Sequence, residues 1–159
     1  MSIATANLCD AHEDKVRVLE PMFNSFGGQP SFFGKIVTLK VFEDNSLVRT
    51  ALESAGEGRV LVIDGGGSLR RALVGDQLAA LAVANGWAGI VVYGCIRDSL
   101  AIGDMDIGVL AIDTHPMKTK KRNTGEADIA VSFGGVTFAP GEWLYADHDG
   151  VIVSASALH

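Results

Sequence analysis

Apolar residues in this chain occur mainly as short, β-branched runs separated by glycine-rich and polar turns. Three uninterrupted runs, at 59–63, 88–93 and 107–112, predict strands, and the glycine-bounded run at 88–93 is typical of a buried parallel strand. The run at 33–42 alternates in part, which predicts a strand with one wetter face. We therefore expect a sheet whose central strands are buried.

Helix-forming sequences lie between these runs. Residues 76–84 are rich in strong helix formers, begin with the acidic Asp76 and are followed by Asn85 and Gly86, a typical helix C-cap. Three shorter helices are expected, one over 5–13 with Thr5 as its cap, one from a cap at Asp44 or Asn45 to Ser54, and one over 99–102. Strands that alternate with helices in this way are typical of parallel α/β units.

The last third of the chain has a different pattern. Short β-type runs at 129–133, 136–138, 143–145 and 151–153 are separated by Gly, Pro-Gly and Asp-rich turns, which predicts antiparallel sheet. Parallel α/β units followed by antiparallel strands fit a three-layer α/β sandwich. The length of 159 residues favours a single domain over residues 1–159.

Composition narrows the class of protein. The chain is 48% hydrophobic and 20% charged, as is ordinary for a globular protein, and its net charge of −6 argues against direct nucleic-acid binding. We see no signal peptide and no run long enough to cross a membrane, so a cytoplasmic location is expected. Cys9 and Cys95 are too few for a disulfide framework and lack metal-ligand spacing, so buried free thiols are expected.

The start of the helix at 76–84 is the first part of the candidate site. Gly75 and Asp76 lie where a helix leaves backbone N–H groups without partners, so those of Gln77 and Leu78 can hold a small carboxylate. Asp76 suits the positive end of the helix dipole. The sequence therefore predicts an anion-binding turn at 75–78.

The end of the strand at 88–93 supplies the second part. Arg97 and Asp98 follow it, at the sheet edge where ligands bind in open α/β folds. Asp98 can bind a hard cation, with water and substrate completing the shell, which suits Mg²⁺ or Mn²⁺; Arg97 offers a planar cationic fork to an anionic substrate. The alternative is an Arg-Asp pair that forms an ordinary surface salt bridge.

Other motifs carry weaker hypotheses. The glycines of 64–68 lack the G-x-G-x-x-G spacing of a dinucleotide site, so we expect a turn that brings backbone close to the active cavity. Arg70 and Arg71 either attract an anion or are solvated, and Cys95 has no visible base that would make it a nucleophile. His148 lies between two aspartates, either as part of a turn or as a metal ligand.

One basic run, Lys118–Gly125, is present. This run can be interpreted as a solvated loop, as a loop over an anionic substrate, or as a contact for an acidic partner. His115 and Pro116 precede it and are expected to form a turn. The sequence leaves these three interpretations open.

Three segments together resemble one protein family. The runs 60–76, 86–98 and 133–138 are similar to the RraA-like family, which is named after the regulator of ribonuclease E activity A and is also called the 4-hydroxy-4-methyl-2-oxoglutarate aldolase family. The similarity extends from Leu8 to Ser154. It implies the family's swivelling β/β/α-type sandwich, assembled as a homotrimer.

The resemblance also implies roles for the site residues. Catalytic members carry an aspartate, twenty intervening residues and then Arg-Asp, as Asp76, Arg97 and Asp98 do here. By resemblance, Asp98 would bind the divalent metal, Arg97 the substrate, and the turn Gly75–Leu78 the pyruvyl carboxylate. Asp76 would order water at the metal or help proton transfer. No lysine in the motif could form a Schiff base, which favours metal over imine chemistry.

The implied function is a lyase that acts on small 2-oxo acids. Cleavage of 4-hydroxy-4-methyl-2-oxoglutarate and decarboxylation of oxaloacetate would share one pyruvate enolate. Longer aldolases carry an acidic residue where this chain has Ala101, and an acidic group in a longer C-terminal region, so decarboxylation is expected to be the more efficient reaction. The alternative from another class is a protein that inhibits ribonuclease E by binding it and needs no metal.

Overall fold

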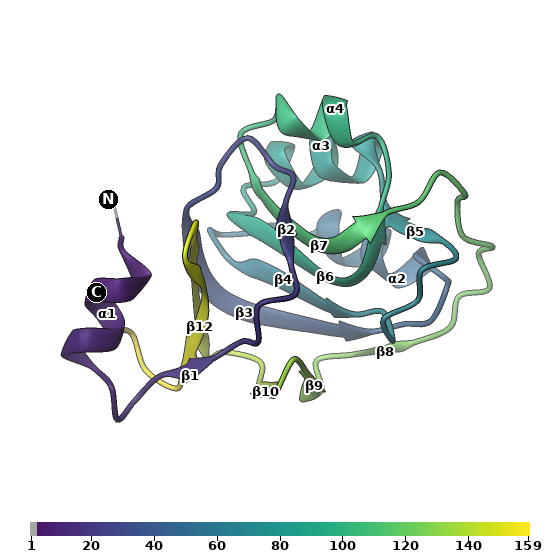
Figure 1. Cartoon of the computed structure of the whole chain (residues 1–159). Coiled ribbons are helices and arrows are strands. Elements are labelled where there is room, and N and C mark those ends of the chain that lie inside the picture. The colour runs from purple at the N-terminus through teal and green to yellow at the C-terminus, as the bar shows by residue number, and fades with distance from the viewer. Residues whose placement is uncertain (1–2) are drawn as a thin grey trace.

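The computed structural model describes residues 3–159 (Figure 1). Its helices are α1 (Thr5–Ala11), α2 (Ser46–Leu52), α3 (Asp76–Ala84) and α4 (Ser99–Gly103). Its strands are β1 (Arg17–Val18), β2 (Asn24–Ser25), β3 (Phe32–Lys40), β4 (Val60–Asp64), β5 (Ala72–Val74), β6 (Gly89–Ile96), β7 (Gly108–Thr114), β8 (Glu126–Ala127), β9 (Val131–Phe133), β10 (Val136–Phe138), β11 (Trp143–Asp147) and β12 (Gly150–Ser154).

The centre of the sheet is parallel, as the apolar runs predict. Strands β3, β4, β6 and β7 pair in that order and in parallel, and β5 adds to the end of β6. The long strand β3 also pairs antiparallel with β11, which continues through β12 to β1. Because β3 belongs to both sets of strands, it joins the parallel and antiparallel parts of the sheet.

Alternate residues of the central strands enter two different cores. In β4, Leu61 and Ile63 face the helices, whereas Val60 and Val62 pack against the layer that holds β9–β12. All four are fully buried, so neither face of the strand meets water. The chain therefore folds into three layers, helices, parallel sheet and antiparallel strands, and the predicted three-layer β/β/α sandwich is confirmed.

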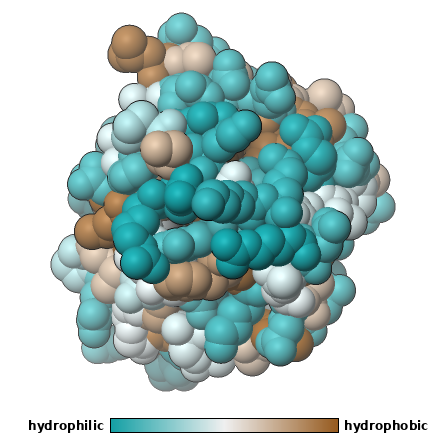
Figure 2. All heavy atoms as spheres, turned by 90° about the vertical axis from the view of Figure 1, so that its right-hand side faces the viewer, coloured by the Kyte–Doolittle hydropathy of each residue, from teal (hydrophilic) through white to brown (hydrophobic). Residues whose placement is uncertain are grey.

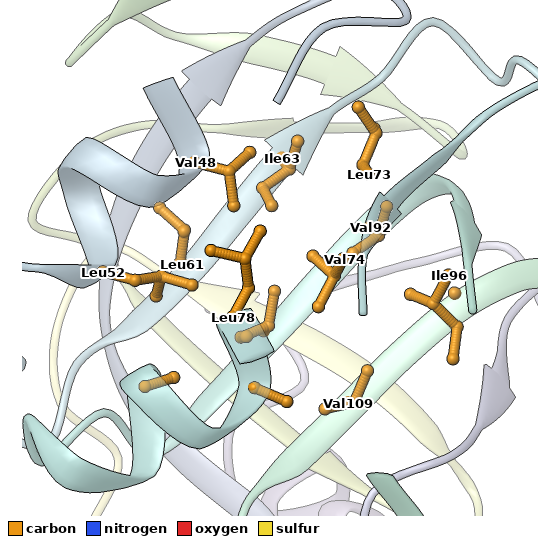
Figure 3. Packing of buried hydrophobic residues seen from close by; sticks show 14 of the residues in the cluster. Val48, Leu52, Leu61, Ile63, Leu73, Val74, Leu78, Val92, Ile96 and Val109 are labelled. Atoms are coloured by element: carbon orange, nitrogen blue, oxygen red, sulfur yellow. The ribbon is translucent and has the colours of Figure 1, made fainter. Parts of the chain in front are cut away.

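The core on the helix side is built by side chains from α2, α3 and the parallel strands. Figure 3 shows Val48 and Leu52 from α2 and Leu78 from α3 directed towards Leu61 and Val92 of the sheet. The figure also labels other members of this cluster: Ile63, Leu73, Val74, Ile96 and Val109. This packing holds the start of α3 close to the carboxyl end of β6.

Two glycines make room for a buried ring in the core on the side of the parallel sheet away from the helices. Gly89 of β6 and Gly108 of β7 are register partners, and the ring of Phe32 lies across both. A Cβ atom would lie 2.4 Å from the ring at Gly89 and 2.0 Å from it at Gly108. The glycines thus provide the space into which a buried aromatic ring packs.

The predicted ends of α3 are confirmed, with Gly86 in the left-handed region at φ 79°. The predicted cap of α1 is wrong, because Thr5 lies inside the helix. Its N–H and Oγ1 donate to Asp147 at 2.7 and 2.6 Å, so the cap comes from the far end of the chain. Strand β6 runs three residues beyond the predicted end, to Ile96, and the short strands β2, β5 and β8 were not predicted.

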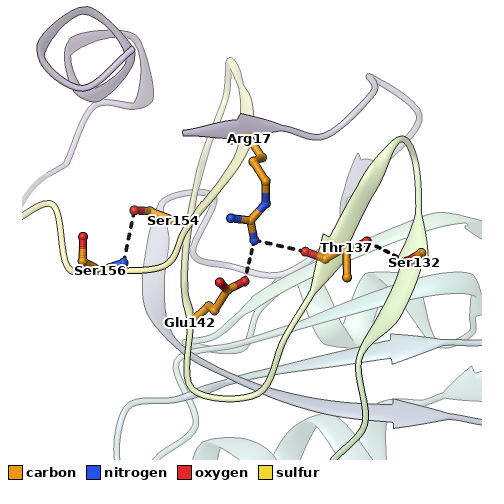
Figure 4. A network of polar contacts seen from close by, with 6 residues as sticks. All are labelled: Arg17, Ser132, Thr137, Glu142, Ser154 and Ser156. Carbon is orange, nitrogen blue, oxygen red and sulfur yellow. Dashed lines mark hydrogen bonds and ion pairs between the residues drawn. The ribbon is translucent and has the colours of Figure 1, made fainter. Parts of the chain in front are cut away.

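A polar contact ties β1 to the antiparallel layer. Arg17 donates to the carbonyl oxygen of Thr137 at 3.1 Å and pairs with Glu142 (Figure 4). The hydroxyls of Ser132 and Thr137 are 2.8 Å apart across the β9–β10 hairpin. These contacts lie far along the chain from the candidate site and serve the fold. Over residues 3–159, helices are too short or too polar to traverse a bilayer.

A pair of matched substitutions tests the helix-side core. Leu52→Ala removes a fully buried side chain, so we expect the free energy of unfolding to fall by about 3 kcal/mol. Leu69→Ala makes the same chemical change at a side chain that is 56% exposed and should change it by less than about 0.5 kcal/mol. Urea unfolding followed by circular dichroism measures both values. Equal losses would contradict this assignment of the core.

Candidate functional site

The site lies where β6 ends and α3 begins. Arg97 directly follows β6, and its N–H donates to the carbonyl oxygen of Val74 at 2.9 Å. Asp98 comes next in the left-handed conformation, with φ 58° and ψ 41°, and as the N-cap of α4 its carbonyl oxygen accepts the N–H of Ile102. A left-handed non-glycine residue costs on the order of 1 kcal/mol, and such costs concentrate at functional sites.

The Asp98 carboxylate faces the start of α3. Its Oδ2 accepts the backbone N–H of Asp76 at 3.0 Å. Gly75 makes this approach possible, because a Cβ atom there would lie 2.8 Å from that oxygen and 3.4 Å from Cγ of Arg97. Gly75 has an extended backbone that any residue can adopt, so the requirement for glycine comes from space alone.

All six predicted site residues line one cavity of about 130 Å³. They come from the start of α3 and the end of β6: Gly75, Asp76, Gln77, Leu78, Arg97 and Asp98. The first hydrogen bond of α3 runs from the N–H of Ala79 to the carbonyl oxygen of Gly75, so the N–H groups of Gln77 and Leu78 precede the regular helical bonds. The predicted convergence is confirmed within one chain, while the roles of the residues stay predictions.

Four further polar residues line the same cavity and were not predicted as site residues. Asn45 is the N-cap of α2, Arg49 lies in its last turn, and Lys118 and Lys121 come from the loop between β7 and β8. The only sequence signal was the basic run Lys118–Gly125, for which a position over an anion was one of three interpretations. Figure 2 shows the face that was at the right of Figure 1, where strongly hydrophilic side chains gather.

The basic loop is held in place by Asp44. This carboxylate is 1% exposed, and its Oδ2 accepts the N–H of Arg122 at 2.9 Å and the N–H and Oγ1 of Thr124 at 3.1 and 3.0 Å. Its Oδ1 accepts the N–H and Oγ of Ser46, the first residue of α2, although the N-cap position itself is Asn45. Burial alone would raise the pKa of Asp44, but hydrogen bonds from Ser46, Thr124 and Arg122 outweigh it and hold the pKa well below its usual range.

Asn45 fastens the loop at a second point. Its Oδ1 accepts the hydroxyl of Thr119 at 2.8 Å, and its Nδ2 donates to the carbonyl oxygen of Leu73 at 3.0 Å. On the other side, the N–H of Ala72 donates to the carbonyl oxygen of Met117 at 2.8 Å. Lys118 and Lys121 therefore extend from a backbone that is fixed on both sides.

The donor set of the cavity fits a hard divalent cation. Within residues 3–159 no group of three His, Cys, Asp or Glu side chains could hold a metal ion. Asp98 Oδ1, however, has no hydrogen-bond donor among those residues and lies in a polar cavity. One carboxylate with room for water and substrate oxygens is a ligand set that Mg²⁺ accepts and a structural zinc does not.

The salt-bridge alternative for Arg97 and Asp98 is not observed in the described part of the chain. The ion pairs there are Arg17–Glu142 and Arg70–Glu43. Arg97 instead donates weakly to the carbonyl oxygen of Pro116, at 3.5 Å. Both charges of the motif therefore remain available to a ligand.

The glycine turn at 64–68 does not itself line the cavity. Gly65 and Gly67 pack against Tyr93, and Gly66 against Phe42. Arg70 is paired with Glu43, and Arg71 donates to the carbonyl oxygen of Lys118. These side chains serve local structure.

Two remaining alternatives find no support. Cys95 is 1% exposed, and burial, followed by the charge of Asp113, raises the pKa of its thiol, which disfavours the nucleophilic thiolate. His148 lines a separate cavity of about 450 Å³ beside the β11–β12 turn. Asp147, its neighbour, is already bonded to Thr5 and Asp149.

Comparison with known proteins shows to which family the chain belongs. The model of the RraA-like family, described as Aldolase/RraA, matches residues 5–153. The chain belongs to the RraA-like family. A protein of Aromatoleum aromaticum, named as a candidate 4-hydroxy-4-methyl-2-oxoglutarate aldolase, is 64% identical over 158 residues, which cover 99% of both chains. A protein of Pseudomonas aeruginosa with the same name is 60% identical over 158 residues. The aligned region covers 99% of this chain and 98% of the Pseudomonas protein.

Two solved structures share the fold of this chain. The RNA-processing inhibitor RraA from Thermus thermophilis has a TM-score of 0.95 and 44% identity, with 98% of this chain and 94% of that chain covered. A Geobacillus kaustophilus structure described as S-adenosylmethionine:2-dimethylmenaquinone methyltransferase has a TM-score of 0.97 and 52% identity, with 98% and 97% covered. Proteins that share this fold thus carry names from three functional classes.

The lowered pKa of Asp44 predicts acid sensitivity. Because the folded-state pKa lies below the unfolded-state value of about 4, Asp44 stabilises the fold above that pH, and the contribution is lost as the pH falls below it. We expect Asp44→Asn to lower the melting temperature at pH 7 by about 5–10 °C. The difference in melting temperature between this variant and the wild-type protein should become smaller towards pH 3. Asp14→Asn, at an exposed carboxylate, is the control, and a gap that does not change with pH would contradict this role.

Proposed function

We propose that the protein is a divalent-metal-dependent carbon–carbon lyase that cleaves 4-hydroxy-4-methyl-2-oxoglutarate to pyruvate and decarboxylates oxaloacetate. The observation that carries this proposal is the shared cavity of Arg97, Asp98 and the start of α3. The aldolase names of relatives with 60–64% identity support it. A volume of about 130 Å³ suits a small acid better than a nucleoside-sized ligand.

The start of α3 is the proposed site of the substrate carboxylate. The N–H groups of Gln77 and Leu78 precede the first helical hydrogen bond and carry the positive end of the helix dipole. The N–H of Asp76 is already taken by Asp98. Two adjacent amides can therefore hold the carboxylate and orient the neighbouring keto group into the cavity.

Asp98 is the residue that would hold Mg²⁺ or Mn²⁺. When bound, the cation would polarise the keto oxygen of the substrate as a Lewis acid. Arg97 places a second positive charge in the same cavity, where it can stabilise that oxygen as it becomes an enolate. Its contact with the carbonyl oxygen of Pro116 limits where the guanidinium can move.

Both reactions break the bond between C3 and C4 of the substrate. In cleavage, the C4 hydroxyl loses its proton, the C4 fragment leaves as a second pyruvate, and the bonding electrons form the enolate of the first. In decarboxylation, CO₂ leaves and the same enolate forms. A proton delivered to C3 then gives pyruvate. We assign Asp76, which lines the cavity, to ordering water or moving these protons.

A binding role is the second candidate function. Its support is the Thermus relative described as an RNA-processing inhibitor, together with a net charge of −6 that suits a basic partner. For this chain the candidate is inhibition of ribonuclease E by docking, without metal. The family's homotrimer remains part of both proposals, since either could use an intersubunit surface.

An assay of pyruvate release separates the two candidates. With oxaloacetate and Mg²⁺ we expect turnover above the metal-only background, and its loss with EDTA. Asp98→Ala and Arg97→Ala should each lower kcat/KM by about 100-fold or more, because each removes charge that stabilises the enolate. Rates equal to the metal-only background in every sample would refute the lyase and leave the binding role.

Gly75→Ala tests the space between α3 and Asp98. The added methyl group meets Oδ2 of Asp98 at 2.8 Å and forces the carboxylate to move, while the backbone angles remain allowed. We expect lyase turnover to fall by at least about tenfold. The melting temperature should change by less than about 3 °C. Full activity in this variant would show that the close approach has no role in the reaction.

A further inference from the structure

A second cavity lies apart from the candidate site and is more than three times as large. Its volume is about 450 Å³, against about 130 Å³ for the candidate site, and the two cavities share no lining residue. It lies between residues 18–25, where the chain passes from β1 to β2, and the turn that joins β11 to β12. A cavity of this volume suits a small organic ligand.

Apolar side chains form the inner wall of this second cavity. Leu19, Leu110 and Val151 are buried members of the core that faces the antiparallel layer, and Phe23 packs against that core. Val18 also lines the cavity, but its side chain is 58% exposed and lies towards solvent. The cavity is therefore an opening at the edge of a core, where the apolar carbon of a ligand would be removed from water.

The charge of the second cavity is negative. Its ionisable lining residues are Glu20, Asp147, His148 and Asp149, with no lysine or arginine among them. Asp147 is already occupied, because it accepts the N–H and Oγ1 of Thr5 at 2.7 and 2.6 Å and the N–H of Asp149 at 3.0 Å. Burial alone would raise the pKa of Asp147, but hydrogen bonds from Thr5 and Asp149 outweigh it and lower the pKa, so the group stays charged.

Glu20 and Asp149 are the carboxylates that remain available to a ligand. Within residues 3–159 neither of them forms an ion pair. The antiparallel pairing of β1 with β12 continues to Leu19, whose N–H donates to the carbonyl oxygen of Val151 at 3.0 Å. One further step in this register places Glu20 beside Gly150, the residue that follows Asp149. The two free carboxylates thus lie at the same end of the cavity.

The backbone next to Glu20 adds further acceptors. Within residues 3–159, the carbonyl oxygens of Glu20 and Pro21 accept no backbone hydrogen bond. A primary ammonium group has three N–H donors, so it can bond to carboxylate and carbonyl oxygens together. An anion would meet no cationic side chain here, which disfavours the 2-oxo acids of the proposed reaction as ligands.

We propose that this cavity binds a small organic amine, whose apolar body packs on Leu19, Phe23 and Val151 and whose ammonium group is held by Glu20 and Asp149. Charge complementarity sets the class of ligand, because an apolar wall meets a negative end with free oxygen acceptors. The proposal does not rest on the lyase or on the ribonuclease-binding role, since it concerns a different cavity and a different ligand.

Three matched ligands separate the effect of charge from that of apolar contact. Tryptamine, tryptophol and indole-3-propionate share an indole ring and end in an ammonium, a hydroxyl and a carboxylate. In an NMR titration of backbone amides, we expect tryptamine to bind with a Kd below about 1 mM and about three- to tenfold more tightly than tryptophol. Indole-3-propionate should bind most weakly, and added NaCl should reduce the preference for tryptamine.

The same titration locates the site. Shifts caused by tryptamine should centre on residues 18–25 and 147–151 and leave Gly75–Leu78 unchanged. Shifts centred elsewhere, equal affinities for the three ligands, or no binding of tryptamine at about ten times the expected Kd would overturn the proposal.

Single substitutions assign the preference to residues. Glu20→Gln and Asp149→Asn should each reduce the preference for tryptamine over tryptophol by about two- to fivefold and leave the affinity for tryptophol unchanged. Glu13→Gln is the matched control, because Glu13 is an exposed carboxylate that does not line the cavity. A preference that both cavity variants keep would contradict the assignment of the ammonium site.

Val18→Trp tests the apolar part of the site. The larger side chain occupies space at the cavity, so tryptamine and tryptophol should both bind at least about tenfold more weakly. Because Val18 is 58% exposed, the melting temperature should change by less than about 3 °C. Unchanged affinity for both ligands would show that they do not bind in this cavity.

A second copy of the chain is the competing occupant. If another protomer covered the cavity, the affinity for tryptamine would fall as the protein concentration rises, and Val18→Trp would lower the mass found by sedimentation. That pair of results would overturn the proposal. An affinity that is independent of protein concentration supports a site for a small amine.

The outcomes for the amine site and for the lyase are distinguishable. Glu20→Gln and Asp149→Asn should leave pyruvate release from oxaloacetate unchanged, because neither residue lines the cavity proposed for the lyase. Selective binding of tryptamine without pyruvate release supports the amine site and refutes the lyase. Pyruvate release with equal binding of the three indole ligands supports the lyase and refutes the amine site.

Discussion

The hydrogen bond from the N–H of Asp76 to the carboxylate of Asp98 is the contact on which the site depends. It joins the first turn of α3 to the second residue after the end of β6, across 22 positions of sequence. The contact depends on a glycine at 75 and is made by a residue with a left-handed backbone at 98. Both features serve one purpose, which is to hold a carboxylate close to free amides and a guanidinium without an ion pair that would neutralise it.

The three-layer fold makes this contact possible. Strands β4 and β6 are buried on both faces, so their register is fixed by two cores at once. Leu78 anchors the first turn of α3 in the helix-side core, while Ile96 anchors the end of β6 in the same cluster. The polar groups at 76, 97 and 98 therefore lie at or next to the ends of elements that are fixed by packing, a condition for precise chemistry.

Local patterns were sufficient to predict much of this arrangement. The ends of α3 followed from Asp76 and from Asn85-Gly86, and the layers followed from apolar runs that change from continuous to short and turn-separated. The six site residues were found because a strand end and a helix start converge in parallel α/β units. Their roles came from resemblance to the RraA-like family, since an Arg-Asp pair alone does not distinguish a metal site from a salt bridge.

Contacts between distant segments could not be predicted. Nothing near Thr5 indicates that Asp147 caps its helix, and nothing near Arg49 indicates that Lys118 and Lys121 share its cavity. Asp44 was correctly expected near the start of α2, but its bonds to Arg122 and Thr124 depend on a loop almost eighty residues away. Such contacts form only once the folded sheet has brought the loop next to α2, so a local sequence pattern cannot predict them.

The central claim is that a divalent cation binds to Asp98 at the start of α3. Paramagnetic broadening of backbone amide resonances by substoichiometric Mn²⁺ tests it most directly. We expect selective broadening at Gly75–Leu78 and at Arg97 and Asp98, reversed by EDTA and absent in Asp98→Ala. Broadening centred instead on the acidic turn at Asp147–Asp149, or unchanged by Asp98→Ala, would contradict it.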